Sequence, residues 1–206
     1  MANKANPVPL AFSAASERNK DPILRILVDA FRDCRQVLEI GSGTGQHAVY
    51  FAQHLPHLIW QPSDLAENIS ELARRIEREG PSNFRMPIVL DVRSHPWASE
   101  SVDGVFSANT LHIMDWESVG HFFQGVGQVL SAGGVLCVYG PFRYGGRYTS
   151  DSNAAFDRDL RAHDPASGIR DFEAVNELAE RQGLKLIADH AMPANNRTLV
   201  WMRASD

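Results

Sequence analysis

The chain has 206 residues, of which 44% are hydrophobic, so it can bury the core of one domain. It carries 20 Lys and Arg against 25 Asp and Glu, a formal net charge of −5 with no long run of either sign. This balance argues against a protein that binds nucleic acid or an anionic membrane through bulk charge. Since no stretch has the length of a membrane span or the pattern of a signal peptide, we expect a soluble cytoplasmic protein.

The first predicted elements are a helix, a strand, a glycine-rich turn and a second helix. Asp21 followed by Pro22 predicts a helix start, with an N-cap and a proline at the first helical position. Residues 35–40 form an apolar run that ends at glycines, and the apolar spacing after the glycines is helical. The sequence therefore predicts a strand that turns sharply into a helix.

Strands and helices continue to alternate along the chain. Apolar runs predict strands at residues 58–61, 87–90, 102–107, 135–139, 185–189 and 198–202. The last two are joined by so short a link that they should be antiparallel. This order predicts an α/β fold, a Rossmann-like and mostly parallel, doubly wound seven-stranded sheet with an antiparallel last strand.

The connection after the strand at 135–139 is longer than a crossover requires. About 44 residues separate Tyr139 from Leu184, whereas a crossover helix with its loops needs about 12 to 20. Residues 172–182 supply the helix, which leaves residues 142–170 as an insertion near the ligand-binding edge. We predict a single domain over 1–206, with an N-terminal lid and helix in 1–34 and a substrate-covering insertion in 142–170.

The glycines after the first strand indicate a nucleoside cofactor. In residues 41–45 glycine stands at alternate positions, so the backbone can turn sharply and present its amides beside a helix N-terminus. Asp64 lies 19 residues after Gly45, at a strand end, where a carboxylate can accept both ribose hydroxyls. A dinucleotide fingerprint would place its third glycine one residue later, at Gln46, so a NAD-dependent oxidoreductase is a less favoured alternative.

With Glu39 two residues ahead, the turn reads E-x-G-x-G-x-G, which resembles motif I of class I S-adenosylmethionine-dependent methyltransferases. Residues 17–23 (E-R-N-K-D-P-I), 107–114, 139–142 (Y-G-P-F) and 168–172 (G-I-R-D-F) also resemble a small methyltransferase-like family, domain of unknown function 938. The likeness runs from about Ser16 to Trp201. It implies the class I methyltransferase fold and S-adenosylmethionine as cofactor, but no substrate.

The resemblance also assigns parts of the cofactor to residues. The backbone at Gly41 and Gly43 would face the methionine part, and Asp91 with the Val92 N–H would face adenine. Trp97 would be either an apolar wall for adenine or an ordinary residue of the hydrophobic core. The candidate cofactor-binding residues are Arg18, Asn19, Glu39, Gly41, Ser42, Gly43, Gly45, Asp64, Asp91, Val92, Asn109 and Thr110.

Methyl transfer from a sulfonium needs alignment and exclusion of water more than it needs a base. For a hydroxyl or protonated amine acceptor, His112 is the first candidate for a base, and a supporting role in the pocket wall is the alternative. Tyr139 and Tyr144 fall where the resemblance puts the acceptor and are candidate catalytic residues that would orient it, with packing as the alternative.

The sequence thus predicts an S-adenosylmethionine-dependent methyltransferase that acts on a small polar or carboxylated molecule, with no nucleic-acid or membrane partner. Arg143, Arg147 and Arg170 are candidates to bind a carboxylate or phosphate, unless they pair with neighbouring aspartates. The histidine and cysteine spacings predict no metal site. The open alternatives are a non-catalytic protein that binds S-adenosylmethionine or S-adenosylhomocysteine, the oxidoreductase, and a peptide or protein methyltransferase with an open groove.

Overall fold

A computed structural model describes residues 9–97 and 100–205. The strands of its main sheet are β1 (Gln36–Ile40), β2 (Ile59–Asp64), β3 (Ile88–Val89), β4 (Val102–Ala108), β5 (Leu130–Gly140), β9 (Leu184–Met192) and β10 (Asn196–Arg203). The helices that pack on it are α1 (Ala14–Ala30), α2 (Gln46–His54), α3 (Ala66–Glu79), α4 (Trp116–Val129) and α6 (Phe172–Arg181).

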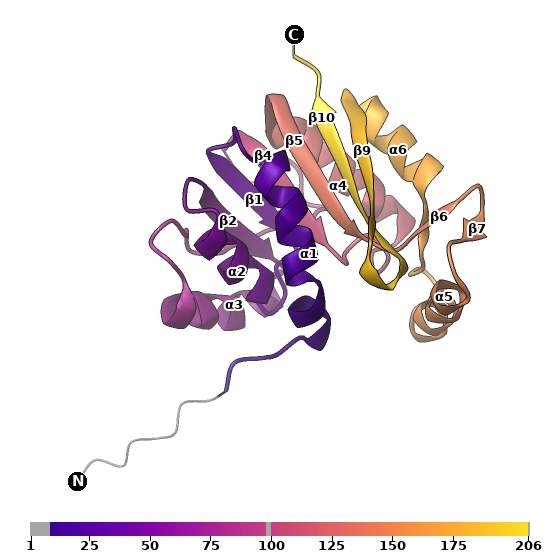
Figure 1. Ribbon diagram of the computed structural model, residues 1–206, viewed down its shortest axis with the longest axis horizontal. Helices are drawn as coiled ribbons and strands as arrows, with labels where there is room; N and C mark the ends of the chain where they lie inside the picture. The colour runs from indigo at the N-terminus through magenta and orange to yellow at the C-terminus, as the bar shows by residue number, and fades with distance from the viewer. Residues whose placement is uncertain (1–8, 98–99, 206) are drawn as a thin grey trace.

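The sheet has the strand order β3-β2-β1-β4-β5-β10-β9 (Figure 1). All neighbours from β3 to β5 are parallel, and β10 is antiparallel to both β5 and β9. The prediction of a mostly parallel seven-stranded sheet with an antiparallel last strand is confirmed. Because the order reverses between β1 and β4, a crevice forms at the carboxyl ends of these strands.

Alternate residues of each central strand enter two apolar layers. Val37 and Phe106 pack in the layer that includes buried residues of α1 and α2, whereas Leu38 and Val105 pack in the layer that includes those of α4 and α6. Figure 1 shows α1 and α2 in front of the sheet and α4 and α6 behind it. Both faces are covered, which explains why the central strands read as continuous apolar runs.

Helix α1 starts earlier than the sequence predicts. Its N-cap is Ser13, whose hydroxyl accepts the Ser16 N–H, and Pro22 lies inside the helix. The predicted start at Asp21 is therefore wrong. A proline removes one intrahelical hydrogen bond, but the buried side chains of Ile23 and Leu27 anchor the helix just beyond it. The strand predicted at 87–90 is also shorter, because β3 contains Ile88–Val89 alone.

The insertion after β5 has secondary structure of its own. It consists of β6 (Phe142–Tyr144), β7 (Arg147–Tyr148), α5 (Asp151–His163) and β8 (Arg170–Asp171), and the strands form a second sheet in the order β7-β6-β8. Figure 1 places α5 and the β6–β7 hairpin together on the β9 side of the main sheet. The sequence predicts the insertion but not its helix, which Ser150 caps by accepting the Asn153 N–H.

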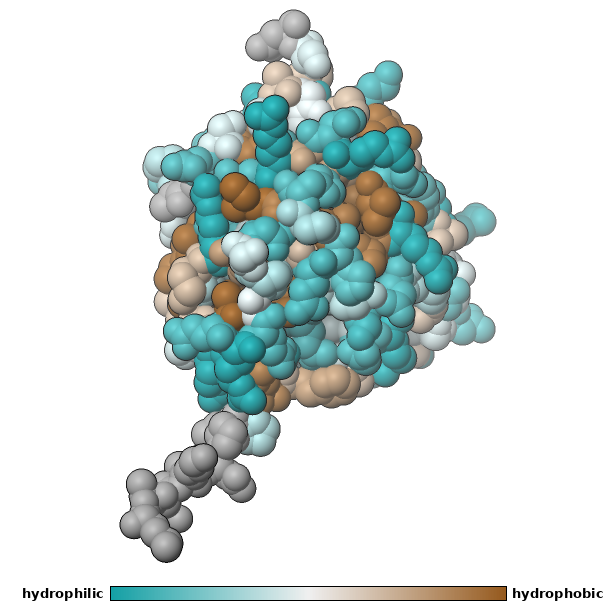
Figure 2. Space-filling model, turned by 60° about the vertical axis from the view of Figure 1, so that its left-hand side comes forward, coloured by the Kyte–Doolittle hydropathy of each residue, from teal (hydrophilic) through white to brown (hydrophobic). Residues whose placement is uncertain are grey.

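The outer surface is mainly polar on the face that Figure 2 shows. Hydrophobic residues there form small separate groups among hydrophilic ones. Across residues 9–97 and 100–205, no helix has both the length and the apolar character that a membrane crossing needs.

Candidate cofactor and substrate site

The turn after β1 requires glycine. Gly41, Gly43 and Gly45 have φ angles of 73°, 53° and 74°, in the left-handed region that other residues rarely adopt. A Cβ atom on Gly41 would lie 2.6 Å from Cγ2 of Thr110, whereas one on Gly43 would meet no atom within 4 Å. The turn is thus packed at its start against Thr110, two residues beyond β4, and open at Gly43, where a ligand can approach the backbone.

Asp64 connects the end of β2 to this turn. Its carboxylate accepts hydrogen bonds from the Gly43 N–H at 2.6 Å, the Leu65 N–H at 2.8 Å and the Asn68 amide at 2.7 Å. The side chain is buried, yet Asp64 also lines a cavity. An ionised carboxylate has about four acceptor sites, so one remains for a ligand hydroxyl.

The cavity at this edge of the sheet has a volume of about 290 Å³. Ligand pockets start at about 300 Å³, so this volume suits a compact group such as a nucleoside. Predicted cofactor residues in its lining are Gly41, Asp64, Asp91, Val92 and Thr110. The lining residues not selected from the sequence include Ile113, Met114, Ser118, Asp164 and Ala166. The first two lie in the singled-out segment 107–114, but no local signal marks Asp164, which reaches the cavity through the fold of the insertion.

Asp91 and Val92 lie on the β3 side of the cavity. The Asp91 carboxylate accepts two hydrogen bonds from the Arg93 guanidinium, at 3.0 and 2.7 Å, and these bonds lower the pKa of Asp91. Trp97 is not in the cavity lining, because it is buried in the core against Phe122. The core alternative for Trp97 is therefore confirmed.

Glu39 lies beneath the turn rather than in the cavity lining. Its carboxylate accepts hydrogen bonds from Trp60 Nε1 and from the Ser42 hydroxyl, both at 3.0 Å. Burial raises the pKa of Glu39 to about 7. Glu39 therefore supports the turn through its hydrogen bond with the Ser42 hydroxyl.

The raised pKa of Glu39 predicts a pH-dependent stability. The carboxyl of Glu39 keeps its proton up to about pH 7 in the native state, whereas in the unfolded state it loses the proton near pH 4.5. Its contribution to the free energy of unfolding is therefore fully present below pH 4.5 and is lost as the pH rises through 7. At about 1.4 kcal/mol per pKa unit, this loss between pH 5 and 7 is roughly 2 kcal/mol. Urea unfolding of wild type and Glu39→Gln at both pH values measures it. The variant should lack this contribution, and equal pH dependence in both proteins would contradict the prediction.

The ends of β4 and β5 bring three predicted residues together. The Asn109 N–H donates to the Tyr139 carbonyl at 2.8 Å, and Asn109 adopts a φ of 58°. A Cβ atom on Gly140 would lie 3.8 Å from His112 Nδ1 and 4.0 Å from Asn109 Oδ1. Asn109, His112 and Tyr139 therefore meet at the carboxyl edge, next to the cavity-lining Thr110.

His112 is buried and neutral. Burial and the positive charge of Arg170 lower its pKa to about 4. Its ring packs edge-on against that of Phe156 in α5, with 5.4 Å between the ring centroids. A neutral imidazole with this pKa accepts a hydrogen bond well but holds a proton weakly at pH 7.

Asn19 and Tyr139, predicted for different roles, are neighbours. Asn19 Oδ1 lies 2.6 Å from His47 Nε2. Burial raises the pKa of the Tyr139 hydroxyl, while hydrogen bonds with Asn19 and Asn196 oppose that shift. Arg18, the residue before Asn19, is exposed.

Tyr144 and Arg143 are engaged within the insertion and its neighbours. The Tyr144 hydroxyl donates to Asp189 at 2.8 Å, and its ring stacks on Phe172. Arg143 pairs with Asp171 at 2.5 Å. Neither residue lines the cavity, so for Arg143 the pairing alternative is confirmed.

The guanidinium of Arg170 binds backbone carbonyl groups of the protein. It donates to the carbonyls of Leu111 at 3.0 Å, of Ala166 at 2.9 Å and of Met114. These contacts hold the segment after β4 against the insertion, and Met114 and Ala166 both line the cavity. Arg170 therefore shapes the wall of the site.

The described residues contain no group of three or more His, Cys, Asp or Glu side chains arranged to hold a metal ion. Cys34 and Cys137 are both buried free thiols. Burial and the neighbouring Asp103 and Asp33 raise the pKa of Cys34 to about 12, so it is a protonated, inert thiol at neutral pH.

The strand order and the glycine turn at its crevice define the Rossmann-like fold of class I methyltransferases. Among solved structures, an O-methyltransferase family protein from Burkholderia thailandensis matches 93% of this chain and 58% of its own, with a TM-score of 0.80 and 16% identity. The S-adenosylmethionine-dependent methyltransferase SibL matches 93% of this chain and 56% of its own, with a TM-score of 0.78 and 21% identity. PigF, solved with S-adenosylhomocysteine, matches 88% of this chain and 55% of its own, with a TM-score of 0.75 and 15% identity.

This chain spans less than two thirds of the length of each of these proteins. A family model described as "Protein of unknown function (DUF938)" matches residues 10–203, and the chain belongs to that family.

Proposed function

We propose that the protein is a methyltransferase that uses S-adenosylmethionine to methylate a small molecule. The observation that carries the proposal is the meeting of the open glycine turn, the Asp64 carboxylate and a cavity at one sheet edge. The methyltransferase fold of the chain and the S-adenosylhomocysteine held by PigF support it.

The donor groups around the cavity suit the parts of this cofactor. Asp64 would accept a ribose hydroxyl at its remaining acceptor site, and Asp91 with the Val92 N–H would face adenine between apolar side chains such as Met114. The backbone at Gly41 and Gly43 would face the methionine part. When bound, the cofactor supplies a methyl group activated by its sulfonium.

The residues of the chain would align the acceptor and keep water away. His112, neutral near pH 7, and Asn109 offer hydrogen-bonding groups at the ends of β4 and β5, and Phe156 of α5 covers the His112 ring. In our proposal the insertion 142–170 encloses the acceptor. Because Arg143 and Arg170 already have protein partners, a small polar acceptor recognised by neutral hydrogen bonds is favoured over a carboxylated one.

Calorimetric titration with S-adenosylmethionine, S-adenosylhomocysteine and NADH in parallel tests the cofactor. We expect micromolar binding of the two sulfur nucleosides and no binding of NADH. Preferential binding of NADH would favour the oxidoreductase, and binding of none would contradict a cofactor at the turn. Tight binding of S-adenosylhomocysteine without methyl transfer to any member of a broad metabolite panel would favour a non-catalytic binding protein.

A further inference from the structure

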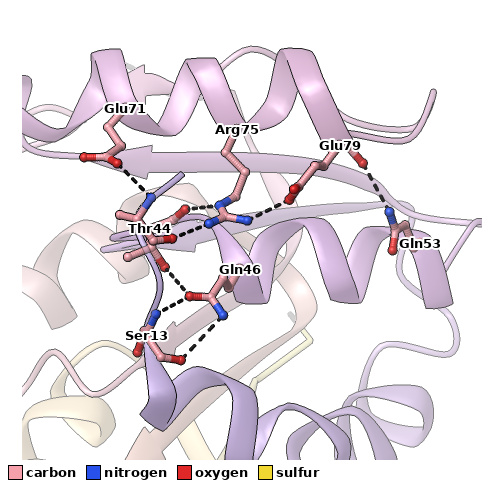
Figure 3. A network of polar contacts seen from close by, with 8 residues as sticks. Ser13, Thr44, Gln46, Gln53, Glu71, Arg75 and Glu79 are labelled. Carbon is pink, nitrogen blue, oxygen red and sulfur yellow. Dashed lines mark hydrogen bonds and ion pairs between the residues drawn. The ribbon is translucent and has the colours of Figure 1, made fainter. Parts of the chain in front are cut away.

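The backbone of residues 9–13, called here the N-terminal segment, is held by side chains of α2 and α3. The Ala11 N–H donates to Glu71 at 3.1 Å, and the Ala11 carbonyl accepts from Arg75 Nη2. Ser13 is bound in the same way by Gln46, which accepts from its N–H and donates to its carbonyl (Figure 3). The bonds engage backbone groups, and the side chain of Phe12 between them is 69% exposed. The segment is therefore docked through its main chain.

The glycine turn is held by the same side chains. Arg75 Nε donates to the Thr44 carbonyl at 2.5 Å, and the Thr44 hydroxyl donates to Gln46 Oε1 at 3.3 Å (Figure 3). A Cβ atom on Gly45 would lie 3.1 Å from Arg75 Cδ, so the stem of Arg75 also packs beneath the turn. The N-terminal segment and the turn thus share two partners, although they are far apart in sequence.

Arg75 joins three parts of the molecule through its three guanidinium nitrogens. Nε bonds the turn, Nη2 bonds the N-terminal segment, and Nη1 pairs with Glu79 of α3 at 2.6 Å. Its side chain is only 8% exposed. A planar, buried guanidinium fixes the relative positions of its acceptors, and its removal leaves two part-buried carbonyls without this donor.

We infer that Arg75 is a positioning residue that couples docking of the N-terminal segment to the conformation of the glycine turn. Whatever stabilises the turn then stabilises the docked segment, and loosening of the segment weakens binding at the turn by the same factor. The inference rests on the proposed function only for the identity of the ligand, S-adenosylhomocysteine, that is used as a probe.

Hydrogen exchange without ligand tests the coupling itself. In Arg75→Met, which keeps the apolar stem, exchange is expected to accelerate in peptides that cover residues 9–13 and in those that cover 41–47. Arg181→Met is the matched control, because Arg181 pairs with Glu177 on the exposed side of α6, and it should change neither region. If Arg75→Met fails to fold, Gln46→Met cuts the same connection from α2. Faster exchange in only one of the two regions, in a folded variant, overturns the inference.

Addition of S-adenosylhomocysteine supplies the second test. In wild type it is expected to slow exchange of residues 9–13, and Arg75→Met should bind it at least about fivefold more weakly, with Arg75→Lys in between. Unchanged affinity in a folded Arg75→Met variant, or an unprotected segment in liganded wild type, also overturns the inference. If wild type does not bind the probe, the proposed function fails, and the ligand-free exchange still decides whether the two segments are coupled.

Discussion

Asp64→Ala is expected to weaken binding of S-adenosylhomocysteine by about tenfold or more. The variant removes the carboxylate that we assign to a ribose hydroxyl, and a hydrogen bond to a charged group contributes roughly 1.5 to 3 kcal/mol. It also removes the acceptor of the Gly43 N–H, so the turn loses a tie to β2. Calorimetric titration measures the affinity, and thermal unfolding verifies that the variant is folded. Wild-type affinity in Asp64→Ala would show that another residue binds the ribose.

Asp103→Ala is the control for this experiment. Asp103 also accepts two backbone N–H groups, from Arg35 at 2.9 Å and Gln36 at 3.3 Å, but at the amino end of β1, the opposite edge of the sheet. Its loss should lower the stability without changing the affinity. The pair of variants therefore separates a ligand contact from the general effect of losing a carboxylate that accepts backbone N–H groups.

Gly125→Ala is expected to lower the free energy of unfolding by about 3 kcal/mol, at the upper end of the usual cost of overpacking. The added Cβ would lie 2.0 to 2.5 Å from three ring atoms of Trp97. The ring is 5% exposed and packs against Phe122, so it cannot move without disturbing the core. Urea unfolding measures the change.

The same substitution at Gly120, on the same helix, should instead raise the free energy of unfolding. A Cβ there would meet no atom within 4 Å, so only the helix propensity changes, and alanine is favoured by about 0.5 to 1 kcal/mol. If both variants were equally stable, contact with Trp97 would not explain the glycine at 125.

Patterns of local origin were read correctly from the sequence. The seven strands follow from short apolar runs, and the positive φ angles of the turn follow from glycines at 41, 43 and 45. Asp64 lies at the end of β2 and contacts the turn, because parallel strands end at the same edge. The start of α1 was missed because the Asp-Pro pair is a strong local signal that the burial of Ile23 and Leu27 overrides.

What the sequence did not predict depends on contacts between distant segments. The lining residue Asp164 reaches the cavity only because the insertion folds back on the segment after β4, where the Gly168 N–H donates to the His112 carbonyl. No local feature of the sequence distinguishes Arg75 from its neighbours Arg74 and Arg78, yet it is buried beneath the glycine turn. The low pKa of His112 likewise arises from burial and from Arg170, far along the chain.

The two ends of the insertion are hydrogen-bonded neighbours, since Phe142 pairs with Arg170 and Arg143 with Asp171. A segment that leaves and returns at adjacent points can change length at a small cost in loop entropy. Residues 145–163 can therefore vary in length without breaking the strand pairs that anchor the segment, whereas Asp164 and Ala166 belong to the cavity wall. In our proposal this segment encloses the acceptor, so changes within residues 145–163 would alter the choice of acceptor while the main sheet stays in place.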